Sequence, residues 1–196
     1  GVRRWAVRLG KEAGLLEANA ALLMKLADDP SLKVRLELAT AAGQVAGELS
    51  AKLLSHLLLG TDDSWVHAGV LSSLHAGNVV SVAFEVAERG RGQQLEALGE
   101  QAVALGADEQ VAGLLLSAAV DGGAEGGLRQ RELLVGMLER LLRDAGRLQR
   151  LQQLQSGLSE ALAGALKRAA EEAVGDGAEA GLRKRSAGAE GGQIGG

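Results

Sequence analysis

The chain has 196 residues, of which 46% are hydrophobic but only 2% aromatic, and its formal net charge is −4. Because it contains no Cys, it has no disulfide, no zinc–thiolate site and no Cys nucleophile. The acidic balance, the scarcity of aromatic side chains and the lack of a basic stripe argue against nucleic-acid binding, and no apolar run is long enough to span a membrane.

Apolar residues recur at helical spacing along the chain, and no stretch shows the strict alternation that is typical of a strand. Gly follows several of these runs, at positions 10, 14, 43, 60, 77 and 106, where helix C-termini are expected. The sequence therefore predicts an all-α protein whose core is packed from Leu, Val and Ala.

Three Val residues mark an internal repeat. Val2, Val34 and Val66 lie 32 residues apart, and each opens a helix with the same apolar rhythm. A Leu- or Val-rich second helix follows each of them, over 15–27, 50–60 and 79–90. One helix pair cannot bury its apolar face alone, whereas a stack of pairs can. We therefore expect a right-handed α-α superhelix of about five antiparallel helix pairs, in which the three Val occupy equivalent places.

The turn before the second copy reads "DDPSLKVR". Asp29 is expected to cap the next helix by accepting backbone N–H bonds, and Pro30 to direct the chain into it. Arg35 is expected to reach an Asp of its own or of a neighbouring repeat. Within the same helix, Leu38 is expected to point into the seam between repeats and Glu37 to face outward.

This turn and the Ala-rich helix after it resemble a HEAT repeat, in which Asp, often Pro, and then Val-Arg precede a helix that ends in Gly. The matching residues are Asp29, Pro30, Val34, Arg35, Ala39 and Gly43 in the second copy, and Val2, Arg3 and Ala6 in the first. The third copy keeps Val66 and an acidic turn, but His67 replaces the Arg. The resemblance implies an armadillo-type fold and a role in protein binding.

The segments "VRRWAVRLG" (2–10), "LADDPSLKVRLELATAAG" (26–43), "DDSWVHAGVLSSL" (62–74) and 132–162 are also similar to the helical region of large planctomycete and verrucomicrobial proteins. These proteins are described as membrane-bound dehydrogenase or haem-binding domain proteins. In that family the helical region lies between a β-propeller domain and a C-terminal cytochrome c domain. The resemblance implies a fragment of an exported, dehydrogenase-type haem protein, and this chain itself has no CxxCH motif for haem attachment.

HEAT-like repeats are expected over 1–120, although the 32-residue register fades from about residue 93, where 93–106 and 108–120 still read as a helix pair. A Gly-rich connection is expected over 121–127, followed over 128–174 by a further, longer helix pair of the same stack, with an amphipathic Leu stretch from 147 onward. A coiled coil is the alternative for this stretch, but the Leu spacing drifts without a sustained heptad. The Gly-rich segment 175–196 is expected to be frayed, and the chain reads as a piece of a longer protein.

His, Asp and Ser residues offer few candidates for chemistry. His67 and His75 would share one side of an unbroken helix, but a metal site would need a third ligand, for which Asp62, Asp63 and Glu85 are the nominal candidates. His67 as a surface residue and His56 at the edge of a packed helix are the simpler interpretations. Ser72 and Ser73 lack a nucleophile elbow, and small Ser residues on a helix more often allow close packing.

The Gly-rich 175–181 lacks the strand and the Lys-Ser/Thr pair of a phosphate loop, and the basic run 182–185 is short enough to be a solvated helix end. We therefore expect no catalytic, cofactor-binding or metal-binding residue. Trp5 and Trp65 stand near the starts of first helices, where they are expected to seal adjacent repeats. Hot-spot anchors for a partner are the alternative.

The sequence is compatible with three functions. The leading one is a non-catalytic α-solenoid scaffold that spaces domains or binds a protein partner on its concave face. The second is a helical section that contributes contacts to the active enzyme of a dehydrogenase-type parent protein. The third is an enzyme of the bilin lyase-like HEAT type, which would need an acid–base cluster that the sequence does not show.

Overall fold

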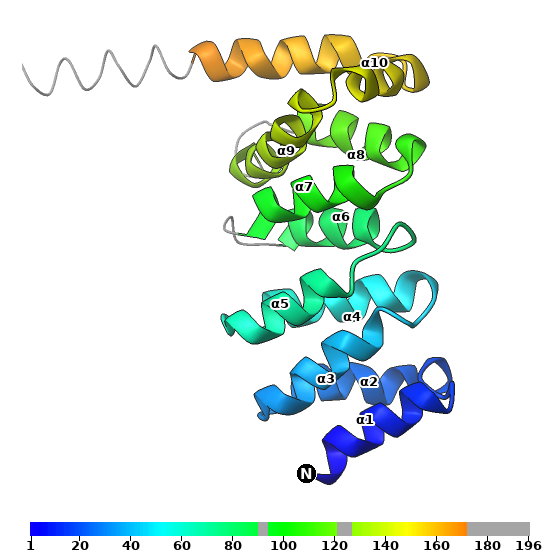
Figure 1. Cartoon of the computed structure of the whole chain (residues 1–196). Coiled ribbons are helices and arrows are strands. Elements are labelled where there is room, and N and C mark those ends of the chain that lie inside the picture. Colours follow the sequence, from blue (N-terminus) through cyan, green and yellow to red (C-terminus); the bar gives the residue numbers. More distant parts are fainter. Residues whose placement is uncertain (90–93, 121–126, 172–196) are drawn as a thin grey trace, which may run out of the picture.

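The computed structural model describes residues 1–89, 94–120 and 127–171, without the side chains of 127 and 128. These residues form helices and connecting turns, and none of them is in a strand. Figure 1 shows the helices stacked one above another from the N-terminus upward. Leu, Ala, Glu and Arg are strong helix formers and supply much of the chain. The prediction of an all-α protein is confirmed for the described residues.

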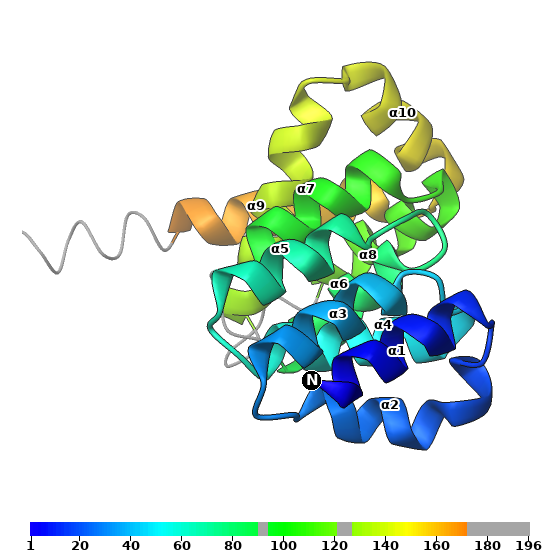
Figure 2. The same cartoon turned by 60° about the horizontal axis from the view of Figure 1, so that its bottom comes forward.

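The first six α-helices form two layers. α1 (Val2–Glu12), α3 (Leu32–Ala42) and α5 (Ser64–Ser72) pack in one layer, and α2 (Ala20–Ala27), α4 (Gly47–Leu59) and α6 (Val79–Arg89) pack in the other. A short 3-10 helix, η1 (Glu17–Asn19), leads into α2. Each second helix also contacts the next pair, because α2 contacts α3 and α4, and α4 contacts α5 and α6. Figure 2 brings α1 and α2 forward at the N-terminal end of the stack.

Beyond α6 the stack continues with α7 (Leu95–Leu105), α8 (Asp108–Val120), α9 (Gly127–Leu142) and α10 (Ala145–Leu154), followed by a helix over 158–171. α7 packs on α6 and α9, and α8 packs on α9 and α10. The sequence predicted one amphipathic stretch from 147 onward, but Gly157, at a φ of +85°, separates α10 from the last helix. Gly tolerates this positive φ because it has no Cβ.

Two predicted segments lie largely outside the described residues. They are the Gly-rich connection over 121–127, of which only the start of α9 is described, and the segment 175–196. Gly43, Gly60 and Gly106 directly follow α3, α4 and α7, as predicted. Gly10, by contrast, lies inside α1 and does not end a helix.

The backbones of α7 and α9 touch at two Gly residues. A Cβ on Gly99 would collide with the carbonyl oxygen of Leu133 and would lie 2.9 Å from the backbone nitrogen of Met137. A Cβ on Gly136 would collide with the carbonyl oxygen of Glu96. These two helices therefore lie at a spacing that only Gly allows at these positions.

A buried polar side chain, Asn78, ties the turn before α6 to the second helix pair. Its Nδ2 donates to the hydroxyl of Ser50 (3.0 Å) and to the carbonyl of Ser73 (3.2 Å). Its Oδ1 accepts the backbone N–H of His75 (2.9 Å), and the Ser50 hydroxyl donates to the carbonyl of Ala42 (2.9 Å). Because a buried amide without partners is costly, this network fixes the turn against α3 and α4.

Candidate functional site

The turn between α2 and α3 is held by Asp29, which is buried beside α1. Its Oδ1 accepts the backbone N–H of Ser31 (2.9 Å) and a bond from Arg3 (3.2 Å), and its Oδ2 lies 2.7 Å from Arg3 Nε. The N–H of Ser31 and the Arg3 guanidinium hold the pKa of Asp29 below its ordinary value, against the effect of burial. The N-cap residue of α3 is Ser31 itself, so the predicted cap is wrong in detail: Asp29 orders the turn just before the helix. Pro30 lies exposed between them.

Arg3, Arg35 and His67 occupy the same place, one residue after the repeated Val. Arg3 pairs with the turn carboxylate just described. Arg35 donates from Nη1 to the carbonyl of Gly60 at the end of α4 (3.2 Å). His67 donates from Nε2 to the carbonyl of Thr61 (2.6 Å), which leaves its Nδ1 to face the Gln94 amide nitrogen at 3.5 Å. Arg35 therefore bonds a helix-end carbonyl and makes no direct ion pair with an Asp in the described residues, although its charge helps to lower the pKa of Asp29 at longer range. In each case the side chain extends from the first helix of a pair to the residues that follow the second helix of the same pair.

The three repeated Val differ in burial. Val34 and Val66 are buried in α3 and α5, whereas Val2 in α1 is exposed. Because α1 belongs to the first pair of the described stack, no described helix covers the side of α1 on which Val2 lies.

Glu37 lies mostly buried between α1 and α3 and does not face outward as expected. Its Oε2 lies 2.9 Å from Arg4 Nε, and its Oε1 lies 3.0 Å from Arg8 Nε. Burial raises the pKa of Glu37, but the hydrogen bonds from Arg8 and Arg4 outweigh it and hold the pKa below its ordinary value. The next residue, Leu38, is fully buried, as predicted. The helical phase is therefore right for Leu38, but α1 covers the side on which Glu37 lies.

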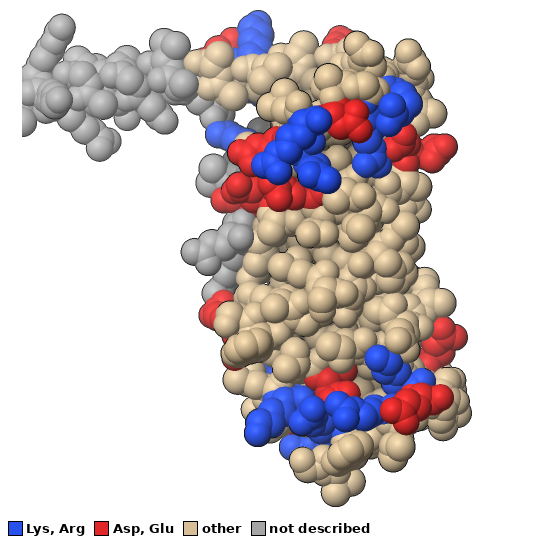
Figure 3. Space-filling view, viewed as in Figure 1, with Lys and Arg blue, Asp and Glu red and all other residues tan. Residues whose placement is uncertain are grey.

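Both Trp side chains are exposed, Trp5 at 59% and Trp65 at 73%. The prediction that they seal adjacent repeats is therefore wrong. The guanidinium of Arg8 lies 5.1 Å from the centroid of the Trp5 ring, within cation–π range. Trp65 lies in α5, within a run over 64–84 that has no Asp, Glu, Lys or Arg. Figure 3 shows that the face around α5 is mostly uncharged, between a band of charged side chains at either end.

The three His side chains lie in separate places. His56 Nε2 lies 2.7 Å from Asp28 Oδ1. His75 Nδ1 accepts a backbone N–H two residues further on, so Nε2 is free to donate to the carbonyl of Gly43 (3.1 Å). α5 ends before His75, so His67 and His75 do not share one helix. Among the residues that the structure describes, no three His, Asp or Glu side chains lie close enough together to hold a metal.

The Ser72 and Ser73 hydroxyls both donate to the carbonyl of Gly69, at 2.9 Å and 2.8 Å. Both hydroxyls therefore satisfy a backbone carbonyl at the C-terminal end of α5. Ser73 also lies against Gly43, where a Cβ would come within 2.9 Å of the Ser73 Cβ. Small side chains here allow the ends of α3 and α5 to approach closely.

A groove of about 520 Å³ lies between the end of α8, α9, α10 and the helix over 158–171. Its walls are mainly Leu and Ala, and its polar lining residues are Arg131, Gln152, Ser159 and Arg168. Arg168 donates to the carbonyl of Ala119 (2.6 Å). The described lining includes no His and no carboxylate, the groups that acid–base catalysis most often uses.

Sequence reasoning missed a recurring contact between Arg side chains and the C-terminal carbonyls of helices. The last carbonyls of a helix lack intrahelical partners and carry partial negative charge, so a guanidinium satisfies them well. Besides Arg35 and Arg168, the pairs are Arg129 with the carbonyl of Glu88 (3.2 Å) and Arg147 with the carbonyls of Gly106 (2.8 Å) and Val103. No local sequence signal distinguishes such an Arg from one on a solvated helix face.

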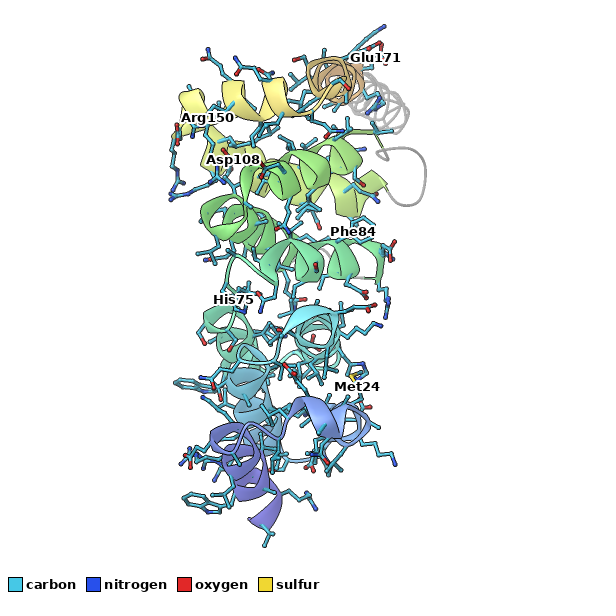
Figure 4. The ribbon with its side chains drawn as sticks, turned by 90° about the vertical axis from the view of Figure 1, so that its right-hand side faces the viewer. Met24, His75, Phe84, Asp108, Arg150 and Glu171 are labelled. Atoms are coloured by element: carbon cyan, nitrogen blue, oxygen red, sulfur yellow. The ribbon has the colours of Figure 1, made fainter. Side chains whose placement is uncertain are left out.

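Asp108 reinforces the contact that Arg147 makes. Its Oδ1 accepts from Arg147 Nε (2.8 Å), and its Oδ2 lies 3.6 Å from Arg150 Nε. Figure 4 shows Asp108 and Arg150 near each other on one edge of the stack, with Met24 and Phe84 on the opposite side. This carboxylate therefore joins the start of α8 to α10 and is engaged by two cations.

No helix in the described part of the chain is both long and apolar enough to cross a membrane. Comparisons with protein-family models, with curated proteins and with solved structures each find no match to this chain. Trp65, a 73% exposed aromatic side chain in the uncharged surface of α5, is the candidate binding feature that the described residues offer most clearly.

Proposed function

We propose that this chain is a non-catalytic scaffold, an α-solenoid of the HEAT or armadillo type with a right-handed superhelix, that binds a protein partner. The two layers of helices and the 32-residue spacing of Val34 and Val66 at equivalent buried places support this architecture. In such arrays each repeat packs on its neighbours and leaves a long continuous surface for partners.

The observation that carries the proposal is the exposure of Trp65 in α5. Trp is the side chain most often found at the energetic centre of protein interfaces, where it combines a large apolar area with few rotatable bonds. The uncharged run over 64–84 around it lowers the cost of removing this surface from water on binding. We therefore place the partner surface on α5, with Trp65 as its anchor.

The polar groups that an enzyme would use are engaged in structural bonds. The Ser72 and Ser73 hydroxyls bond the backbone of α5, and the His side chains bond carbonyls or Asp28 in separate turns. This dispersal supports a binding role over catalysis.

Site-specific photocrosslinking tests the partner surface in cells that make the protein. A photoreactive side chain at position 65 is expected to give one discrete protein adduct, and the same group at the exposed Gln110 of α8, outside the uncharged run, is expected to give none. Equal labelling from both positions, or no adduct from position 65, would remove the assignment to α5.

We also propose that this chain is part of a larger exported protein. The similarity of 2–10, 62–74 and 132–162 to helical regions of dehydrogenase-type haem proteins supports a role as the helical section of a larger exported protein. Reading the coding sequence on either side for a β-propeller domain and a CxxCH motif tests it directly. Finding neither would refute the larger dehydrogenase-type protein and would leave the scaffold proposal itself unchanged.

A further inference from the structure

The groove of about 520 Å³ beside α9 lies between two levels of the stack. On one side its walls are α9 and the C-terminal end of α8, and on the other they are α10 and the helix over 158–171. Figure 1 shows this last helix above α9. Because described helices form both walls, the space between them results from how these helices pack. We call it the α9 groove.

Small side chains leave the α9 groove open. Ala occurs five times in its lining, at 118 and 119 in α8 and at 163, 165 and 169 in the last helix. On another side of α9, by contrast, Gly99 and Gly136 bring α7 into backbone contact. The last helix therefore crosses α9 at a spacing that its own Ala side chains do not fill.

Large apolar side chains along the α9 groove lie partly in water. Val135 and Leu142 of α9 are 43% and 77% exposed, and Leu166 of the last helix is 65% exposed. Leu134 and Leu162 of the same lining are buried. A molecule that covers the exposed part of this wall removes apolar surface from water, and this burial is the main source of binding energy for an aliphatic ligand.

Both charged residues of the lining lie at one end of the α9 groove. Arg168 donates to the carbonyl of Ala119 (2.6 Å), near the end of α8. Ala118 also lines a smaller cavity together with Leu133 of α9. The end of α8 therefore adjoins the first turns of α9, where Arg131 lies.

The positive charge at this end is not balanced within the described lining, which contains no Asp or Glu. The partner of Arg168 is a neutral carbonyl, which takes one of several N–H donors of the guanidinium. An anionic group placed here therefore gains a charge-assisted hydrogen bond. Toward the opposite end, where α9 leads into α10, the polar lining residues are the neutral Gln152 and Ser159.

A ligand that matches the α9 groove has one long apolar chain and one anionic end. From Arg131 to Leu142 the helix rises about 16 Å, given roughly 1.5 Å per residue, which suits an extended alkyl chain better than a compact ring system. The volume lies within the range of small-molecule sites. A sugar or a nucleotide would lose its hydration along the Leu and Ala walls without gaining hydrogen bonds in return.

We propose that the α9 groove binds one long-chain fatty acid, with its alkyl chain along Val135, Leu142 and Leu166 and its carboxylate at Arg168. Arg131 adds positive charge at the same end of the groove. Burial of the alkyl chain provides the affinity, and the position of the charge determines which way the chain lies. This ligand site is separate from the partner surface on α5 and does not depend on it.

Thiol labelling of the full chain tests the site. Because the chain has no Cys, Val135→Cys introduces a single thiol in the wall of the α9 groove. Leu154→Cys in α10 is the matched control, since Leu154 is similarly exposed at 48% but lies outside the lining. The probe ligand is dodecanoate, kept below the concentration at which it forms micelles.

Dodecanoate is expected to slow labelling at position 135 about tenfold when its concentration is about ten times its dissociation constant, because only the unoccupied site reacts. The labelling rate at position 154 is expected to stay unchanged. No protection at position 135, or equal protection at both positions, would overturn the proposal.

The carboxylate is tested by two matched changes. The dodecyltrimethylammonium cation has the same chain with the opposite charge, and at the same concentration it is expected to leave labelling at position 135 unchanged. Arg168→Gln keeps a donor for the Ala119 carbonyl but removes the charge, and it should raise the dissociation constant of dodecanoate about tenfold. Arg140→Gln, in α9 but outside the lining, should leave that constant unchanged.

Circular dichroism melts of the two Arg variants check that each is folded. Equal protection by the anion and the cation, or an unchanged dissociation constant in folded Arg168→Gln, would overturn the proposal, because the site would then take any apolar chain.

The same thiol separates other occupants of the α9 groove. Labelling without ligand that is much slower at position 135 than at position 154, at every protein concentration, would assign the groove to another segment of this chain. Protection that grows with protein concentration would assign it to a second copy. Protection by vesicles of phosphatidylcholine and phosphatidylglycerol, without protection by dodecanoate, would assign it to a membrane surface. Each of these results would replace the fatty acid.

Discussion

Two helix contacts in this molecule achieve close packing by opposite means. α3 meets its neighbours through side chains, with Leu38 in the core and Glu37 paired to Arg4 and Arg8. α7 meets α9 through backbone atoms, at Gly99 and Gly136. The first contact can adjust when a side chain changes its rotamer. The second cannot, because its spacing is set by atoms that have no freedom to move aside.

The largest effect is expected at the glycine contact. Gly136→Ala should lower the free energy of unfolding by about 3 kcal/mol or more, because the new Cβ collides with the backbone of Glu96 and forces α7 and α9 apart. Urea denaturation followed by circular dichroism measures the change.

Gly113 of α8 is the matched control for this substitution. It lies in a helix with no atom within 4 Å of a Cβ placed there. Gly113→Ala should therefore raise the free energy of unfolding by about 0.5–1 kcal/mol through helix propensity alone. If both substitutions shifted the midpoint in the same direction, the close contact of α7 and α9 would be refuted.

Truncation in α3 should have the next largest effect. Leu38→Ala removes a fully buried side chain and should cost roughly 2–4 kcal/mol through lost transfer energy and a cavity. The exposed Leu32 at the start of the same helix is the control, and its change to Ala should stay within about 0.5 kcal/mol. Equal losses at both positions would show that the helical phase of α3 is misassigned.

The smallest effect is expected for the charge at Glu37. Because Arg8 and Arg4 hold its pKa below the ordinary value, the ionised carboxylate stabilises the fold above about pH 4.5, and this contribution is lost as pH falls through the lowered pKa. Glu37→Gln should therefore cost roughly 1 kcal/mol at pH 7, and the gap from the unchanged chain should narrow toward pH 3.

Urea midpoints measured at pH 7, 5 and 3 check the Glu37 prediction. The lowered pKa of Asp29 also contributes to acid sensitivity, but it does so in both proteins and cancels in the difference. A gap that stayed constant across this range would mean that the carboxylate charge contributes nothing.

The repeated Val and the helical phase were predictable because they depend on periodicity. A buried position recurs every three or four residues, so Leu38 could be placed in the core without any knowledge of its neighbours. The helix ends at Gly43, Gly60 and Gly106 followed from the same local rules.

The features that sequence reasoning missed depend on contacts between distant segments. Glu37 looked solvent-facing because nothing in α3 shows that Arg4 and Arg8 of α1 lie over it. Gly99 and Gly136 carried no prediction, because a Gly inside a helix is ordinarily unfavourable and only the contact between α7 and α9 explains it. Trp65 was expected to pack between repeats because large aromatic side chains are usually well buried. Its exposure depends on how the helices pack around α5, which the local sequence does not show.

The exposure of both Trp rings also has an optical consequence. The chain has no Tyr and two Trp, so its ultraviolet fluorescence comes almost entirely from indole rings that already sit largely in water. Unfolding should therefore shift the emission maximum very little, although helix content collapses. The same property makes the emission a low-background reporter, because a blue shift on adding another molecule would mean that Trp5 or Trp65 has been covered.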